Sequence, residues 1–506
     1  MPLDAPAILL GFIDFYALRC FLLPGNWGIG SDWAGAYPML LADERCFKTL
    51  WACKMHFMIN RLILIVAFIV ASATFAVGAP ILLDPAAPPS PALRYKLLPD
   101  FAEQTPGNAA PIYVVAFAIL PRDAAAADRL GALLSVPLDQ LRVKDVAPLL
   151  KDYAGTFEQL RLAEQRDHCR WDLPYREQGP RTQLPFLTSS RQLAVALAVR
   201  ARWQIAQRKY DDAIETLRSG FALARAVETD AMLMQCMVGV GNDRMMLDVV
   251  EEFQQSPGAP NLYWALASLP TPLIDARSAF AIQRLWSMEK VPMLAGQRVE
   301  QIDPKILRDF YYRIRGQEDQ SSDAPLEARV AKCMEMVAHY CAARQYLSSV
   351  GVQNDALDQM PAESLLAINW IHEAQTWNDD VYKWLALPYW QSHAAIEKAE
   401  ENLAASESAQ ANPLLSFSPG VAAALKQIAQ VERQRAMLRT IESIRAYAKL
   451  HSGKLPQSLD DLTETPAPPD PMTGKPFEYR ADGTSATLAA DEGDAKTSIA
   501  YHIQLR

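Results

Sequence analysis

Hydrophobic and polar residues alternate with helical spacing over most of the chain. Between about residues 105 and 450, apolar side chains recur every three or four positions, which places them on one face of a helix. Proline or glycine separates these segments, as at Pro257-Gly258 and Gly351. The pattern predicts helices at 109–119, 122–136, 138–164, 188–208, 210–226, 229–255, 272–291, 303–315, 325–350, 362–391 and 412–450. Residues 105–411 are therefore predicted to form a helical body.

The pattern changes from helical to strand-like after Gly453. Apolar residues then alternate with polar ones on both sides of an Asp482-Gly483 pair, which is typical of the turn of a β-hairpin. These alternating residues are Phe477, Tyr479, Ala486 and Leu488, and a further strand is indicated by Tyr501, Ile503 and Leu505. The predicted fold class is therefore mainly α, with a long helix and a small α+β module in residues 412–506.

Residues 58–79 have the layout of a secretory signal peptide. Arg61 gives a positive start, residues 62–70 are all apolar, and small residues crowd the end up to Ala79. Cleavage could follow Ala76, Gly78 or Ala79. The alternative is an uncleaved anchor, because the apolar stretch is about long enough to span a membrane. We expect the protein to be exported, either periplasmic or extracellular, or anchored to the membrane by this segment alone.

Two segments flank this export signal. Residues 1–57 precede it, although a signal peptide normally opens a chain, and they show no sustained periodicity. We interpret them as a start codon assigned too far upstream, with Met58 or Met55 as the true first residue; a genuine extension is the alternative. Residues 80–104 begin with a proline-rich stretch and are predicted to form a stiff linker.

Composition limits the classes of function. The chain has 506 residues, which indicates two or three domains, and its formal net charge is −9. We expect no nucleic-acid partner, because such binding needs a basic surface. Four cysteines follow residue 79, too few for a disulfide framework in so long a chain. One bridge is possible among Cys169, Cys236, Cys333 and Cys341, and the sequence leaves the pairing open.

A pair of antiparallel helices is indicated between residues 194 and 225. The residues that carry this pattern are Leu197, Ala201, the run Lys209-Tyr210-Asp211-Asp212-Ala213-Ile214, and Leu217. The unit resembles a single tetratricopeptide repeat, which implies a helix-hairpin body. It departs from that pattern at Gln204, Gly220 and Arg225, and no second unit follows at a period of about 34 residues.

The C-terminal tract resembles the tail of type II secretion pseudopilins. The motifs are Tyr447, Gly453-Lys454-Leu455-Pro456, Leu459, Leu462, Asp470-Pro471, Gly474, Pro476-Phe477 and Tyr479. The resemblance covers some 60 residues and implies a helix packed on a small antiparallel sheet. The pilin N-terminal helix and its cleavage site are absent from the sequence. The resemblance therefore implies a structural module and not pilus assembly.

Most of residues 93–490 resemble a family of exported bacterial proteins without known activity. The residues that carry this resemblance are Leu97-Leu98-Pro99-Asp100, Thr105-Pro106-Gly107-Asn108-Ala109-Ala110, Cys169-Arg170-Trp171 and Pro257-Gly258-Ala259-Pro260-Asn261-Leu262-Tyr263-Trp264-Ala265-Leu266. The resemblance implies an architecture and a compartment but no chemistry.

Motifs with established chemistry do not occur in the sequence. It has no P-loop, dinucleotide-binding glycine motif, serine-hydrolase elbow, HExxH zinc motif or CxxC pair. We therefore predict no catalytic residues, no metal site and no cofactor. The sequence does not decide whether the protein is an enzyme, although the missing motifs favour a role without catalysis.

Three tryptophans are the candidate ligand-binding residues. Trp370, Trp377 and Trp384 follow one another at intervals of seven, so a continuous helix would place their indoles on one side. Such a stripe can line a groove for a partner or a sugar, or it can be core. The predicted function is binding or scaffolding at the cell envelope, with an envelope protein or a glycan as the possible partner. The alternative is an envelope hydrolase whose acidic residues converge only in the fold.

Overall fold

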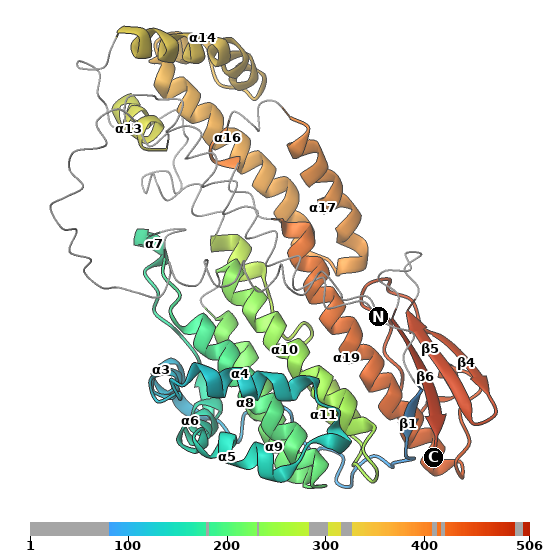
Figure 1. Cartoon of the computed structure of the whole chain (residues 1–506). Helices are drawn as coiled ribbons and strands as arrows, with labels where there is room; N and C mark the ends of the chain where they lie inside the picture. The colour runs from blue at the N-terminus through green and yellow to red at the C-terminus, as the bar shows by residue number, and fades with distance from the viewer. Residues whose placement is uncertain are drawn as a thin grey trace, which may run out of the picture. The chain divides into compact units, whose positions relative to one another are not determined.

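A computed structural model describes residues 80–178, 182–229, 232–282, 302–314, 326–406, 412–415, 420–490 and 499–506. It confirms the predicted fold class, since helices dominate and a small sheet module follows near the C-terminus (Figure 1). Residues 1–57 and the export signal at 58–79 lie outside the described residues, as does the part 283–291 of the helix predicted at 272–291. In the described part of that helix, residues 277–282 are helical and residues 272–276 are not. Within the described ranges, no helix is both long and apolar enough to cross a membrane.

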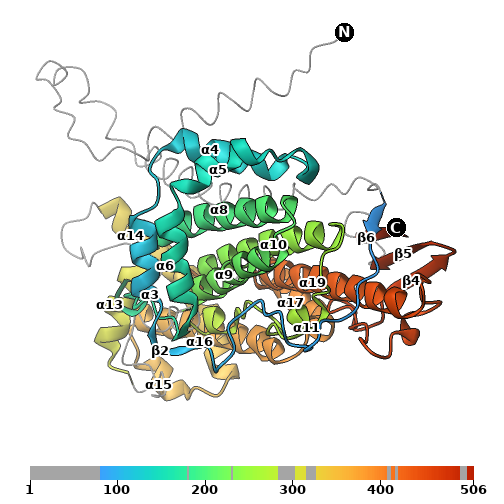
Figure 2. The same ribbon diagram turned by 90° about the horizontal axis from the view of Figure 1, so that it is seen from below.

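The first half of the described chain is a layered set of helices. These are α3 (Ala110–Ala118), α4 (Ala124–Ala132), η1 (Leu133–Ser135), η2 (Leu138–Gln140), α5 (Val143–Lys151), α6 (Ala154–Glu164), α7 (Tyr175–Gln178), α8 (Phe186–Ala206), α9 (Tyr210–Glu228), α10 (Leu233–Gln254) and α11 (Tyr263–Ala267). Helices α8, α9 and α10 pack side by side, and α10 also packs against the long helix α19 (Val421–Leu450) (Figure 2).

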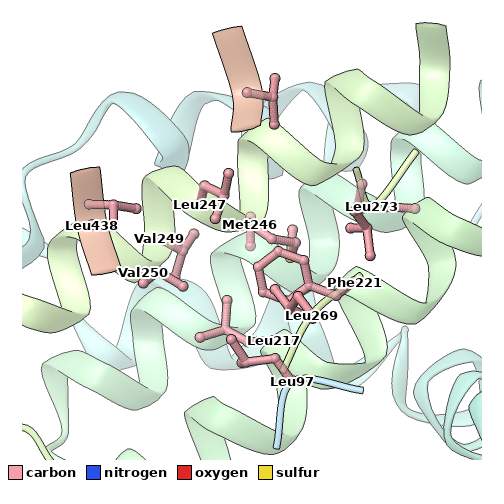
Figure 3. Packing of buried hydrophobic residues seen from close by; sticks show 14 of the residues in the cluster. Leu97, Leu217, Phe221, Met246, Leu247, Val249, Val250, Leu269, Leu273 and Leu438 are labelled. Carbon is pink, nitrogen blue, oxygen red and sulfur yellow. The ribbon is translucent and has the colours of Figure 1, made fainter. Parts of the chain in front are cut away.

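The helix pair predicted around residues 194–225 is present as α8 and α9. Ala201, Ala213 and Leu217 are fully buried where the helices meet, and Leu217 belongs to the core drawn in Figure 3. Gly220 departs from the repeat pattern for a physical reason, because a Cβ there would collide with Met246 of α10. The close approach of α9 and α10 therefore makes a three-helix layer. A repeat array stays a prediction.

The C-terminal module is a four-stranded sheet that packs beside α19 (Figure 1). Its strands are β1 (Ile81–Leu83), β4 (Glu478–Asp482), β5 (Ser485–Ala490) and β6 (Ile499–Leu505), in the order β1-β6-β5-β4. Strands β4 and β5 form the predicted antiparallel hairpin, with Gly483 at a positive φ in its turn. Strand β6 pairs antiparallel with β5, as the alternation at Tyr501, Ile503 and Leu505 indicates.

The interpretation of residues 80–104 as a linker needs correction. Ile81–Leu83 forms β1 and pairs in parallel with β6, with Ile81 opposite Ile503. Ile81 and Leu83 are buried in the main core, and burial of such side chains contributes about 1.5–3 kcal/mol each. Proline stiffens the residues that follow, but the segment as a whole belongs to the folded body.

A second hydrophobic core lies in the helices between residues 302 and 415. These helices are α13 (Pro304–Ile314), α14 (Leu326–Ser349), α15 (Asn354–Asp358) and α16 (Ala362–Tyr382). The single helix predicted at 362–391 is wrong in its extent, because α16 gives way to a 3-10 turn η6 (Lys383–Ala386) and a separate helix α17 (Tyr389–Ala404). Pro388 causes the break, since it disfavours the helical conformation at the residue before it.

A two-stranded parallel ladder holds the start of the helical body. Strand β2 (Thr105–Asn108) pairs with β3 (Arg166–His168). The side chain of Asn108 continues the ladder: its amide donates to the carbonyl of Arg170 at 2.8 Å and its oxygen accepts from the Arg170 N–H at 2.8 Å. Trp171 follows and stacks on Phe186 with ring centroids 4.0 Å apart.

Candidate functional site

A cleft lies where α5 and α6 cover one side of α8 and α9. It has a volume of about 500 Å³, and we call it the α6–α8 cleft. Aliphatic and aromatic side chains from α5 and α6, among them Leu150 and Phe157, line one part. Polar groups of α8 and α9 line another part. Helix packing creates the cleft because α5 contacts α8 while α6 contacts α9 (Figure 2).

Glu164 ends α6 and is the buried acid of the cleft. Its Oε2 accepts a hydrogen bond from the Ser219 hydroxyl at 2.6 Å, and its Oε1 lies 3.5 Å from Nε of Arg218. Burial raises the pKa of Glu164 to about 7; the hydrogen bond and the guanidinium oppose that rise, and Glu215 adds to it. Glu164 therefore exchanges a proton close to neutral pH.

Arg200 of α8 is a cation of the cleft that lacks a protein partner. Its guanidinium carbon lies 4.5 Å from the ring centroid of Phe157, in cation–π contact. No hydrogen bond or ion pair joins Arg200 to any residue that the structure describes. Burial lowers the pKa of Arg200, which the charge of Asp212 partly offsets. Its donors remain available to a ligand in the cleft.

Arg202 contrasts with Arg200 because its donors have protein acceptors. Arg202 lies two residues further along α8 and is buried. Its Nε donates to Glu252 at 2.6 Å, and its other nitrogens donate to the carbonyls of Leu133 and Val136. One arginine thus joins α8 to its neighbours, while the other lines the cleft.

Two other polar groups of α8 behave differently from each other. The indole N–H of Trp203 is inaccessible to solvent and has no hydrogen-bond partner. Gln204, in contrast, accepts a hydrogen bond from the Thr216 hydroxyl at 2.7 Å, which joins α8 to α9 beneath the cleft. Arg200 and Trp203 are three positions apart and lie on one side of the helix.

An ion pair, two acids and a lysine complete the charges around the cleft. Arg161 and Glu158 pair at 2.9 Å on α6, so their charges offset each other. Asp212 and Glu215 of α9 are exposed, and Lys151 ends α5. The cleft therefore combines one unpaired guanidinium, one acid that titrates near neutrality and an apolar wall.

The three tryptophans proposed as ligand-binding residues do not share one surface. Trp370 is 6% exposed and stacks on Tyr311, with ring centroids 4.9 Å apart. Trp377 is half-buried and packs against both hydrophobic cores. Trp384 lies beyond the end of α16, in η6. The helix break at residue 383 separates the third indole from the first two, and ligand binding at these residues stays a prediction.

A smaller cleft of about 220 Å³ lies between α14 and α16. Trp370 lines it together with Tyr346 and Glu373. The pKa of Glu373 is raised by burial, although hydrogen bonds from Asn412 and Asn369 oppose the rise. The side-chain nitrogen of Asn412 donates to Glu373 at 3.0 Å, so this carboxylate already has a structural partner.

Helix α19 carries several buried charges, and they are paired. Arg433 binds Asp470 through two hydrogen bonds of 2.9 and 2.7 Å. Arg445 pairs with Glu442 at 3.0 Å and also donates to the carbonyl of Asp84 just after β1. These contacts tie the sheet module and the N-terminal strand to the helical body, so we assign them to architecture.

The sequence predicted none of the cleft residues. Arg200 and Glu164 lie in ordinary amphipathic helices, where charged residues normally face solvent. One signal was present: Arg200 and Arg202 interrupt an otherwise apolar run between residues 193 and 203. Charges within such a run are expected to have a partner or a role.

Known proteins offer no guide to this cleft. Comparisons with protein-family models, with curated proteins and with solved structures find no match for the chain. In the described ranges, no group of three or more His, Cys, Asp or Glu side chains could hold a metal ion. Cys236 is a buried free thiol, and Cys333 and Cys341 are exposed free thiols on α14.

Proposed function

We propose that this chain is an exported protein of the cell envelope that binds a ligand, or a segment of a partner protein, in the α6–α8 cleft. The observation that carries the proposal is the half-buried Arg200 guanidinium, which lines the cleft, contacts the Phe157 ring and has no protein acceptor. Holding a charge partly out of water is costly unless the charge is paired. A ligand that accepts hydrogen bonds from Arg200 would offset that cost.

Binding fits the cleft better than catalysis. Hydrolysis at Glu164 is the second candidate, because a carboxyl group with a pKa of about 7 in a cleft can act as a general acid or base. Its Oε2, however, is engaged by Ser219 and its Oε1 lies near Arg218. The two acids closest along α9, Asp212 and Glu215, are both exposed. The cleft therefore holds one acid in place but provides no second activated group for catalysis.

Export rests on the sequence of residues 58–79, and the fold is compatible with it. All three candidate cleavage positions precede Ile81, where β1 begins. Processing at any of them would leave the four-stranded sheet intact. N-terminal sequencing of the protein recovered from the envelope fraction tests this part of the proposal. A mature N-terminus beyond Leu83, or recovery only from the cytoplasm, would contradict it.

Filling the cleft tests the binding function without removing any charged group. Ala154 is exposed and lines the cleft, so Ala154→Trp would occupy it. Ala125→Trp, at an exposed position of α4 outside the cleft, is the matched control. We expect full-chain protein to retain a partner or ligand from envelope extract, the control to retain it equally, and Ala154→Trp to lose it. Equal retention by both variants would refute binding in the cleft.

A further inference from the structure

We propose that the α6–α8 cleft recognises a carboxylate attached to an apolar group, the chemistry of a peptide's C-terminal residue, with Arg200 as the anchor of the carboxylate. The inference rests on the proposed binding function and names its ligand class. Two features of the cleft carry it: a guanidinium that is restrained but has no protein acceptor, and an apolar wall.

The guanidinium of Arg200 is already positioned for an anion. Its contact with the Phe157 ring, at 4.5 Å, restrains the planar group while leaving its N–H donors free of protein acceptors. Arginine binds carboxylates through two parallel N–H···O bonds, which adds geometric specificity to the charge attraction. A restrained guanidinium loses little further freedom when such a ligand binds.

The shape of the guanidinium favours a carboxylate over a single-atom anion. Arginine presents its N–H donors in a fixed planar fork. A ligand with two acceptor oxygens can therefore engage Arg200 with both of them.

The remaining lining selects an apolar substituent. Leu150, Ala154 and Phe157 lie beside the donors and offer no hydrogen-bonding side chain. The Phe157 ring is already in contact with Arg200, so that face is not available for stacking on a sugar. An aliphatic or aromatic side chain next to the carboxylate fits this wall better than a polyol.

The nearby acids set a requirement that can be tested. Asp212 is the carboxylate whose charge acts on Arg200, yet it is exposed and forms no side-chain hydrogen bond with it. If Arg200 binds an anionic ligand, the negative charge of Asp212 repels that ligand and weakens its binding. Asp212→Asn should then tighten binding. If Asp212 were instead the structural partner of Arg200, the same substitution would lower stability and would not improve binding.

The test uses the full chain, expressed and purified as the cell processes it. Titration calorimetry or NMR measures binding of N-acetyl-L-leucine, of its uncharged amide N-acetyl-L-leucinamide, and of glucuronate. For so small a ligand we expect a Kd of roughly millimolar order for the acid. We expect the amide to bind at least about 10-fold more weakly, because a hydrogen bond to a charged group contributes about 1.5–3 kcal/mol. Glucuronate should bind more weakly than the acid.

Variants assign the effect to Arg200. Arg200→Gln should weaken binding of N-acetyl-L-leucine by about 10-fold or more. Arg191→Gln, an exposed arginine on the same helix outside the cleft, should leave it unchanged. If Arg200→Gln does not fold, Arg200→Lys keeps the positive charge but removes the planar fork of donors, and it should weaken binding by a smaller factor.

Each contrary outcome overturns a defined part of the inference. Equal affinity for acid and amide would refute carboxylate recognition but leave the cleft as a binding site. Stronger binding of glucuronate would replace the apolar ligand by a sugar acid. No binding of any probe would refute the ligand class, while the Ala154→Trp capture would still decide the proposed function independently.

Discussion

The buried arginines of α19 and the half-buried Arg200 of the cleft differ in what they contact. On α19, Arg433, Arg435 and Arg445 are almost completely buried, and each meets a carboxylate within 3.0 Å. In the α6–α8 cleft, Arg200 meets only an aromatic ring. Desolvating a charge is costly in both places, so the difference lies in what offsets the cost. On α19 the protein supplies the partner, whereas in the cleft it leaves a position for one.

The comparison indicates that arginines with a structural role can be told from an arginine with a binding role by whether the protein supplies a carboxylate partner. The paired arginines connect segments far apart in sequence: Arg435 joins α19 to Asp243 of α10, and Arg445 joins it to the residue that follows β1. Removing one partner from such a pair should damage the fold. Removing Arg200 should damage binding and leave the fold nearly unchanged. The predictions below test this difference, from the largest effect on stability to the smallest.

Arg433→Met should produce the largest loss. It leaves the Asp470 carboxylate, itself 2% exposed, without its cation, and breaking a buried pair in this way costs about 3–5 kcal/mol. The double variant Arg433→Met/Asp470→Asn removes both charges and should recover a large part of that loss. Urea denaturation measures the free energy of unfolding of both proteins. A loss below about 1 kcal/mol in the single variant would show that the pair does not hold the module.

Glu164→Gln should change how stability depends on pH. The folded pKa of about 7 lies above the ordinary value of 4.5 for a glutamic acid, so the folded state holds the proton more tightly than the unfolded state. The resulting stability is fully present below about pH 4.5 and is lost as pH rises through about 7, a total of roughly 3 kcal/mol. The glutamine resembles the protonated acid and cannot lose a proton. Relative to wild type, it should therefore gain stability by that order between pH 4.5 and 8.

The measurement compares unfolding free energies of wild type and Glu164→Gln at several pH values. Only the difference between the two proteins is informative, because burial also raises the pKa of Glu228 and of Asp243 to about 7. A constant difference over this range would mean that Glu164 is ionised throughout. It would then contradict the protonated acid in the cleft.

Gly220→Ala should have an intermediate effect. The added Cβ would collide with Met246, which is fully buried between α9 and α10, and overpacking of this kind costs about 1–3 kcal/mol. The better helix propensity of alanine offsets about 0.5–1 kcal/mol of it. Gly241→Ala is the matched control, because an added Cβ there meets nothing within 4 Å. Thermal unfolding should show a lower midpoint for the first and a slightly higher midpoint for the second.

The sequence predicted the elements of this fold better than their contacts. The spacing of apolar residues located α8, α9 and the β4–β5 hairpin, because those signals are local. The pairing of β1 with β6 joins residues 81 and 503. The residues near Ile81 give no local signal that predicts a strand partner so far along the chain. The proline-rich composition instead indicated a linker.

Two residues of the motifs in the C-terminal tract, Asp470 and Gly474, have structural roles. Asp470 accepts hydrogen bonds from the N–H of Met472 and from the Thr473 hydroxyl, as well as from Arg433, so it shapes the turn before β4. Gly474 has a positive φ, and a Cβ there would lie 2.7 Å from the ring of Trp390. Such residues fix packing and turns. The cleft residues form no sequence motif. That Arg200 has no partner can be recognised only in the folded structure, where its neighbours are known.

Arg200→Gln should have the smallest effect on stability, and this result would distinguish Arg200 most clearly from the paired arginines of α19. The substitution removes a cation–π contact of about 0.5–1 kcal/mol, but it also removes the cost of holding a charge partly out of water. No protein acceptor loses its partner, unlike Asp470 in the Arg433 variant. We expect the free energy of unfolding to change by less than about 1 kcal/mol, measured by urea denaturation beside Arg433→Met. A loss above about 2 kcal/mol would place Arg200 among the structural arginines and would remove the main argument for a binding cleft.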